Sequence, residues 1–181
     1  EIIYYLLQKK SFIEDCLFKD YYKLNRIAIP SSITSIGNRS FYNCKSLKRI
    51  SIPSSVSCIG SRAFSQCLSL ERIVIPSKIK LIEDACFYEC SSLREINIPF
   101  SVTSIGANSF GSCSNLKETL IPFSVSSIGE GAFSDCTSLL YVSIPSVTSI
   151  KNNVFRRCTS LKQVTIPSSV TEIGFYSFNE C

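Results

Sequence analysis

The sequence of 181 residues contains no histidine, methionine or tryptophan, and charged residues make up only 18% of it. Without histidine the chain lacks the most frequent general base of enzymes and a frequent metal ligand. No phosphate-binding loop, no pair of catalytic carboxylates and no Cys-x-x-Cys pair is found in the sequence. We therefore expect a protein that is not an enzyme and that holds no cofactor and no metal.

Long apolar runs are also missing. Residues 2–7 form the nearest candidate, and they are far shorter than the roughly 18–20 residues that a membrane-spanning helix needs. The net charge is +5, but lysine and arginine are scattered along the chain, which argues against nucleic-acid binding. The sequence shows no secretory signal, starts at Glu1 and stops at Cys181 inside a repeat, so we expect a fragment of a longer protein.

Three residue types recur with one common spacing. The prolines are separated by five intervals of 23 residues and a last one of 22: Pro30, Pro53, Pro76, Pro99, Pro122, Pro145 and Pro167. The phenylalanines keep the same step: Phe41, Phe64, Phe87, Phe110, Phe133, Phe155 and Phe178. Each is followed three residues later by a cysteine: Cys44, Cys67, Cys90, Cys113, Cys136, Cys158 and Cys181. Spacing this regular indicates a solenoid in which each period forms one turn.

The period over residues 47–69 predicts the shape of one turn. Ile50 and Ile52 alternate with polar neighbours, so they are expected to point inward from a short strand that ends at Pro53. Gly60 is expected to favour a left-handed turn. Residues 63–67 are expected to form a short helical or 3₁₀ turn on the opposite side. Stacked in register, such turns predict an α/β solenoid with a parallel strand ladder, with about seven repeats in residues 24–181 and a degenerate N-terminal repeat or cap in residues 1–23.

One full period reads Leu-x-x-Ile-x-Ile-Pro-x-x-Val-x-x-Ile-Gly-x-x-Ala-Phe-x-x-Cys-x-x, and over residues 24–181 this pattern closely resembles the BspA-like class of leucine-rich repeats. The class occurs in surface antigens of certain bacteria and anaerobic protists. The resemblance implies a leucine-rich-repeat fold and a location at the cell surface or outside the cell. It also implies a role in binding host-cell, matrix or microbial surface proteins. Thr119, in an isoleucine slot, and a one-residue deletion after Pro145 depart from the pattern.

The cysteines are interpreted mainly as packing residues. Turns in register bring the seven periodic cysteines close together, but their Cβ vectors run parallel, which disfavours disulfides. We expect buried, unpaired thiols that act as small apolar side chains. Cys86, next to Phe87, is also assigned to the core, whereas Cys16 and Cys58 are expected to be exposed.

The outward strand positions form the predicted binding surface. Two residues after each repeat leucine stand Arg26, Arg49, Arg72, Glu95, Glu118, Tyr141 and Gln163. After the prolines stand serines, except for Phe100 and Phe123 on adjacent turns. The candidate partner-binding residues are Phe100, Phe123, Arg49, Arg72, Glu95, Glu118 and Tyr141. The alternative for the two phenylalanines is that their rings only stack on each other and cover the sheet edge.

Asn38 begins the sequon Asn38-Arg39-Ser40, so it is a possible glycosylation site in a secreted eukaryotic protein.

Two hypotheses on function follow. The first is a non-catalytic protein-interaction module of a cell-surface antigen or adhesin, which binds host or microbial surface proteins through the repeat array. The alternative is an intracellular leucine-rich-repeat scaffold that binds cytoplasmic proteins.

Overall fold

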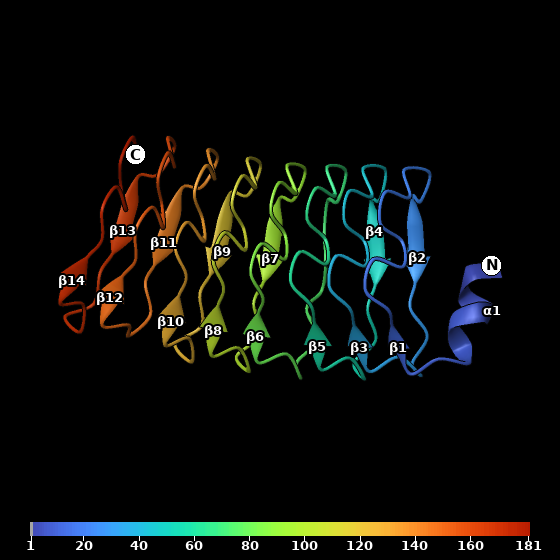
Figure 1. The fold of residues 1–181 in the computed structure, drawn as a ribbon. Helices are drawn as coiled ribbons and strands as arrows, with labels where there is room; N and C mark the ends of the chain where they lie inside the picture. Colours follow the sequence, from blue (N-terminus) through green and yellow to red (C-terminus); the bar gives the residue numbers. More distant parts are fainter. Residues whose placement is uncertain (1) are drawn as a thin grey trace.

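The computed structural model describes residues 2–181, with side chains from residue 4 onward, and forms one solenoid (Figure 1). It starts with a short helix, α1 (Ile2–Gln8), at one end. The turns carry two rows of short strands. The row that we call the strand face consists of β2 (Arg26–Ala28), β4 (Arg49–Ser51), β7 (Glu95–Asn97), β9 (Glu118–Leu120), β11 (Tyr141–Ser143) and β13 (Gln163–Thr165). The second row consists of β1 (Phe12–Ile13), β3 (Ser35–Ile36), β5 (Cys58–Ile59), β6 (Leu81–Ile82), β8 (Ser104–Ile105), β10 (Ser127–Ile128), β12 (Ser149–Ile150) and β14 (Glu172–Ile173).

The strand face is a parallel ladder in which each residue pairs with its equivalent one repeat later. β2 pairs with β4, and β7, β9, β11 and β13 form one four-stranded sheet. The turn between these groups joins them through single bridges, Arg49 to Arg72 and Val74 to Asn97. The structure thus confirms a parallel-strand solenoid of about seven turns with the predicted spacing.

The second row is interrupted twice, between β5 and β6 and between β10 and β12 (Figure 1). The interruptions coincide with Glu83 and Lys151, which replace the repeat glycine, and the second also lies just after the shortened Pro145–Val147 segment. Where glycine is present, its amide donates to the preceding turn, as from Gly60 to the Ile36 carbonyl at 2.8 Å. The amides of Glu83 and Lys151 make no such bond to a described residue.

The role predicted for Gly60 is therefore wrong. Among the described glycines, Gly131 is the one with a positive φ, and Gly60 has an ordinary one. A Cβ at position 60 would lie 2.7 Å from the amide nitrogen of Asn38 on the preceding turn. Glycine is favoured here because the neighbouring backbone approaches closely, and not because the chain is left-handed.

The predicted helical or 3₁₀ turns opposite the strand face are also wrong: the described residues there form chained β-turns. Arg62 and Gln66 have φ of 55° and 62°, and every repeat has left-handed residues at these two positions, which stops a helix from propagating. Successive backbone amides donate alternately within their own turn and to the next turn. Ser65 donates within its own turn to Arg62, whereas Phe64 donates to the Cys86 carbonyl of the next turn at 2.9 Å. This alternation satisfies the backbone without a helix.

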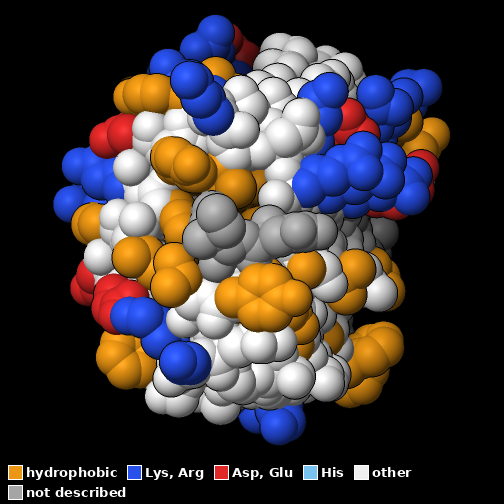
Figure 2. All heavy atoms as spheres, turned by 90° about the vertical axis from the view of Figure 1, so that its right-hand side faces the viewer, with side chains coloured by type: hydrophobic (Ala, Val, Ile, Leu, Met, Phe, Trp, Pro, Cys, Tyr) orange, Lys and Arg blue, Asp and Glu red, His pale blue; other side chains and the backbone are white. Residues whose placement is uncertain are grey.

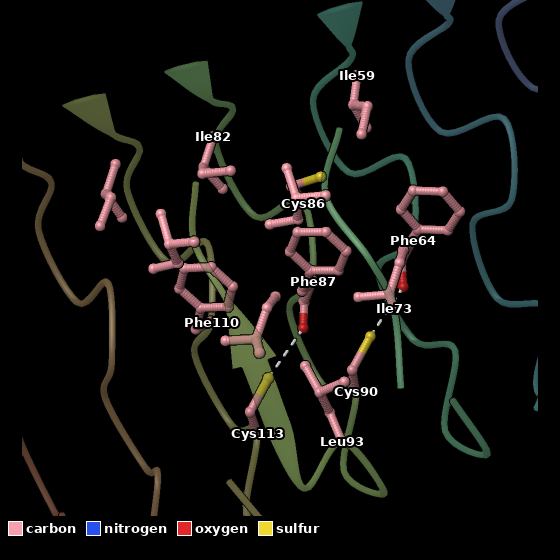
Figure 3. Packing of buried hydrophobic residues seen from close by; sticks show 14 of the residues in the cluster. Ile59, Phe64, Ile73, Ile82, Cys86, Phe87, Cys90, Leu93, Phe110 and Cys113 are labelled. Atoms are coloured by element: carbon pink, nitrogen blue, oxygen red, sulfur yellow. Dashed lines mark hydrogen bonds between the residues drawn. The ribbon is translucent and has the colours of Figure 1, made fainter. Parts of the chain in front are cut away.

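The core is a set of ladders of like residues (Figure 3). The repeat phenylalanines stack face to face along the solenoid, with centroids 5.1–5.6 Å apart from Phe18 to Phe178. The small residues before them are buried as well, including Cys86, as the sequence predicted. Leucine, isoleucine and cysteine ladders fill the remaining space, so each turn buries its apolar face only against its neighbours.

The N-terminal segment closes one end of this core. Leu7 of α1 is buried, and Ser32 donates to its carbonyl oxygen at 3.5 Å. Phe18 stacks on Phe41, so residues before 24 already continue the phenylalanine ladder. Figure 2 looks onto this end and shows many apolar side chains at its surface. The exposed large apolar residues between residues 4 and 22 are Tyr4, Tyr5, Leu6, Phe12, Leu17, Tyr21 and Tyr22.

Candidate functional site

The outward positions of the strand face form two parallel columns. In β4 the exposed residues are Arg49 and Ser51, while Ile50 between them is buried. The first column, which we call the charged column, contains Arg26, Arg49, Arg72, Glu95, Glu118, Tyr141 and Gln163. The second column, which we call the neutral column, contains Ala28, Ser51, Val74, Asn97, Leu120, Ser143 and Thr165. The predicted candidates Arg49, Arg72, Glu95, Glu118 and Tyr141 thus lie in one line.

Charge along this column is segregated. Arg26, Arg49 and Arg72 are successive neighbours in register, and Glu95 is a neighbour of Glu118. The two blocks meet at an ion pair in which Arg72 Nε lies 3.3 Å from Glu95 Oε1. Both side chains are largely exposed, so this pair contributes little to stability. Its consequence is an orientation: along the charged column a partner meets positive charge up to Arg72 and negative charge at Glu95 and Glu118.

The neutral column adds apolar surface to the middle of the face. Val74 and Leu120 are 76% and 62% exposed. Beside them the face is hollowed: Arg72, Val74, Glu95 and Leu120 are among the residues around an open depression of about 390 Å³. A second depression of about 430 Å³ includes Leu120 and Tyr141. These are shallow surface hollows suited to side chains of a macromolecule.

Phe100 and Phe123 follow the prolines at the ends of β7 and β9. Their ring centroids are 5.5 Å apart with planes tilted by 38°. The rings touch each other, as the structural alternative supposed, yet they remain 63% and 81% exposed. Contact between the rings therefore covers only part of their surface. We refer to these two residues as the aromatic pair.

The burial of the cysteines follows the prediction except at Cys181, a periodic cysteine that is exposed. Every cysteine is a free thiol; Cys44, Cys67, Cys86, Cys90, Cys113, Cys136 and Cys158 are buried, whereas Cys16, Cys58 and Cys181 are exposed. Burial raises the pKa of Cys113 and of Cys158 to about 12. These two ladder thiols are thus protonated and unreactive at neutral pH.

Sequence reasoning missed the hydrogen bonds of the thiol ladder. Each periodic cysteine donates its S–H to the carbonyl oxygen of the phenylalanine of the preceding turn, as from Cys67 to Phe41 at 3.2 Å. The same geometry recurs from Cys44 to Cys181. The position itself could have indicated these hydrogen bonds. Other leucine-rich repeats can have asparagine at the position of the periodic cysteine, and asparagine is also a hydrogen-bond donor.

Asn38 lies in an exposed turn, but its side chain is already engaged. Its Nδ2 donates to Asp15 Oδ2 at 3.2 Å, and its Oδ1 accepts from the Ser61 amide at 2.9 Å. Ser40, the third residue of the sequon, is buried in the core. Modification of Asn38 remains a prediction, and in this fold a glycan would have to share Nδ2 with Asp15.

No described group of three or more histidine, cysteine, aspartate or glutamate side chains could hold a metal ion. Within residues 2–181, no helix is long and apolar enough to cross a membrane.

Comparison with known proteins gives the same architecture. The sequence matches the BspA type leucine rich repeat region, in six copies, over residues 11–140 and 132–181. The structure is similar to the leucine rich repeat protein of T. pallidum, with 34% identity, a TM-score of 0.86, and 94% of this chain and 80% of that chain covered. A leucine-rich repeat protein from Bacteroides ovatus shows 25% identity and a TM-score of 0.51, with 94% and 68% covered. Curated proteins give no match. The chain belongs to the BspA-type leucine-rich-repeat family, and this membership indicates a protein-interaction module.

Proposed function

We propose that this chain is the protein-binding module of a cell-surface antigen or adhesin, and that it contacts host or microbial surface proteins through the strand face and the aromatic pair. The observation that carries the proposal is the exposure of Phe100 and Phe123, two rings on adjacent turns of a regular scaffold. Exposed apolar groups that cluster in this way are typical of interaction sites. Aromatic side chains and arginine are also enriched among the residues that dominate binding energy.

The surroundings of the aromatic pair support this role. Val74 and Leu120 add exposed apolar groups on the strand face, and Arg72, Glu95 and Glu118 supply charge around them. Every turn is tied to its neighbours by backbone hydrogen bonds, so little conformational freedom is lost when a partner docks. A surface location is supported by the family, whose BspA-like members include surface antigens.

The proposal is tested by a binding experiment with a double variant. Labelled protein is titrated onto intact cultured animal cells and onto bacterial cells. The combination of Phe100→Ala and Phe123→Ala should weaken binding at least tenfold, or by about 1.4 kcal/mol. Its melting temperature should change only slightly, because neither ring belongs to a core ladder. Phe175→Ala is the matched control, since this ring is 79% exposed but lies outside the surface. Normal binding by a double variant that melts much earlier would show that the rings are structural.

The intracellular scaffold is the second candidate, and the exposed thiols favour it. Cys16, Cys58 and Cys181 are exposed and free. A reducing cytoplasm would keep such thiols unmodified, whereas an oxidising surface would not. A membrane-impermeant reductant followed by a membrane-impermeant thiol reagent, both applied to intact source cells, separates the two locations. Labelling of Cys58 before lysis supports the surface module, and labelling only after lysis supports the scaffold.

A further inference from the structure

The charged column has an unusual symmetry. Read from the N-terminal turn, its signs are three positive, two negative and then neutral, and the change of sign occurs between Arg72 and Glu95. If a second charged column is laid against this one with its turns in the opposite order, positive residues of one column face negative residues of the other. We propose that this makes the strand face self-complementary, and that its partner is a second copy of this chain with its turns in the opposite order. The inference rests on the proposed function in that it names a partner for the same face.

The arrangement follows from a twofold axis that runs parallel to the strands and passes between the turns of Arg72 and Glu95. Such an axis brings two strand faces together, reverses the turn order and keeps each column opposite its own counterpart. Twofold interfaces of this kind are the commonest among protein oligomers. The facing pairs in the charged column are then Arg72 with Glu95, Arg49 with Glu118, and Arg26 with Tyr141.

A second copy supplies the opposite charge that Arg49 and Glu118 lack within one copy. Arg49 has arginines as neighbours on both sides, and Glu118 lies beside Glu95. Like charges directly opposite each other in a sheet are unfavourable. Arg49 and Glu118 make no ion pair with a described residue, so both are free to pair across the interface. At the axis, the Arg72–Glu95 ion pair and its copy place four charges of alternating sign together.

The neutral column allows the faces to approach. It contains no charged residue, so docking buries no charge there without a partner. Val74 and Leu120 are large exposed apolar side chains in it, and their removal from water favours association. In the same arrangement Val74 faces Asn97, and Leu120 faces Ser51.

The expected dimer is weak and depends on salt. Exposed ion pairs contribute little affinity, but complementary charge determines orientation and excludes wrong partners. Salt screens such pairs, so dissolved salt should dissociate the dimer. On a cell surface, many copies in parallel would raise the strength of a weak contact between two cells through multivalency.

Sedimentation velocity over a concentration series, at low and high salt, tests the proposal. The parent chain should associate reversibly, and more weakly at high salt. Arg49→Glu and Glu118→Arg should each weaken association at least tenfold, because each places like charges at two equivalent contacts. An equimolar mixture of the two variants should associate like the parent, since opposite charges then meet at both contacts. Arg156→Glu is the control: it changes the net charge equally, lies off the strand face and should leave association unchanged.

Three outcomes would overturn the proposal: a parent chain that stays monomeric, association that neither charge reversal affects, or a mixture that fails to recover. Recovery by mixing also shows that both variants are folded.

Binding to heparin provides a further test. If the chain stays monomeric but binds heparin, and Arg49→Glu abolishes that binding, the arginine block serves an anionic polymer instead. A monomeric chain whose cell binding still requires the aromatic pair would leave the proposed function standing and reject only the second copy as partner.

Discussion

The thiol of Cys90 donates a hydrogen bond of 3.1 Å to the carbonyl oxygen of Phe64, which belongs to the preceding turn. Cys90→Ala removes this bond and leaves a small void in the core. We expect a loss of about 1–3 kcal/mol in the free energy of unfolding, from the bond and the lost packing together. Urea denaturation measures it. Cys58→Ala, at an exposed position, should change stability by less than about 0.5 kcal/mol. Equal effects of the two variants would contradict a structural role for the thiol ladder.

Stability should fall at alkaline pH. Burial raises the pKa of Cys113 and Cys158 to about 12, whereas an unfolded thiol titrates near about 8.5. Below the pKa of the unfolded chain, the thiols are protonated in both the folded and the unfolded state, and their contribution to the free energy of unfolding is fully present. As pH rises above it, the unfolded chain loses protons first, so stability drops by about 1.4 kcal/mol per pH unit for each such thiol. Urea denaturation at neutral pH and at about pH 10 measures the slope. Cys113→Ala should make the slope shallower, and an unchanged slope would refute the linkage.

Phe87→Ala should be among the most damaging single substitutions. The ring of Phe87 is fully buried and stacks between Phe64 and Phe110 at 5.6 and 5.5 Å. Truncation of a buried phenylalanine costs roughly 3–5 kcal/mol. Ser91→Ala should cost less than about 1 kcal/mol, since its hydroxyl makes one long bond of 3.4 Å to the Leu68 carbonyl. Denaturant melts that gave equal losses would refute the ladder assignment.

Thr119→Val should stabilise the protein. Thr119 occupies an isoleucine slot, pairs in register with Ile96 and is buried, and its hydroxyl has no hydrogen-bond partner among the described residues. Valine keeps the shape and removes the unpaired oxygen, so we expect a gain of about 1–2 kcal/mol by thermal or urea melts. Thr103→Val is the matched control, because that hydroxyl donates to the Lys80 carbonyl at 3.2 Å and should not be improved by removal.

Glu83→Gly should repair the strand row between β5 and β6. With the side chain removed, the amide of residue 83 can donate to the Ile59 carbonyl, as Gly106 does to Ile82 at 2.7 Å. One hydrogen bond contributes about 0.5–1.5 kcal/mol and the glycine costs about 0.5–1 kcal/mol, so net stability should hardly change. Hydrogen exchange is therefore the measurement: the amide of residue 83 should become protected. The reverse change, Gly106→Ala, should lose protection there, because its Cβ would meet the Asp84 amide nitrogen at 2.7 Å.

Much of the architecture could be predicted because the period is so regular. Ile50 and Arg49 alternate in a strand, so their inward and outward positions followed from the pattern. The burial of Cys86 followed from its place beside Phe87, and the exposure of Cys58 from its variable position. The conformation of the turns could not be predicted in this way. Arg62 and Gln66 adopt positive φ although neither residue favours it, because the hydrogen bonds to the next turn hold the backbone there.

Residue type and spacing alone set the length of a turn, the ladders of like residues and the membership of the charged column. How neighbouring turns meet depends on the folded chain. In the folded chain Arg72 pairs with Glu95, and the rings of Phe100 and Phe123 touch yet stay exposed. The second row of strands is interrupted at Glu83. The reason is physical: turns stacked about 4.8 Å apart bring residues of neighbouring repeats into contact. The charge, shape and Cβ atoms of those neighbours then determine the ion pairs, ring contacts and strand interruptions between turns, which no single repeat contains.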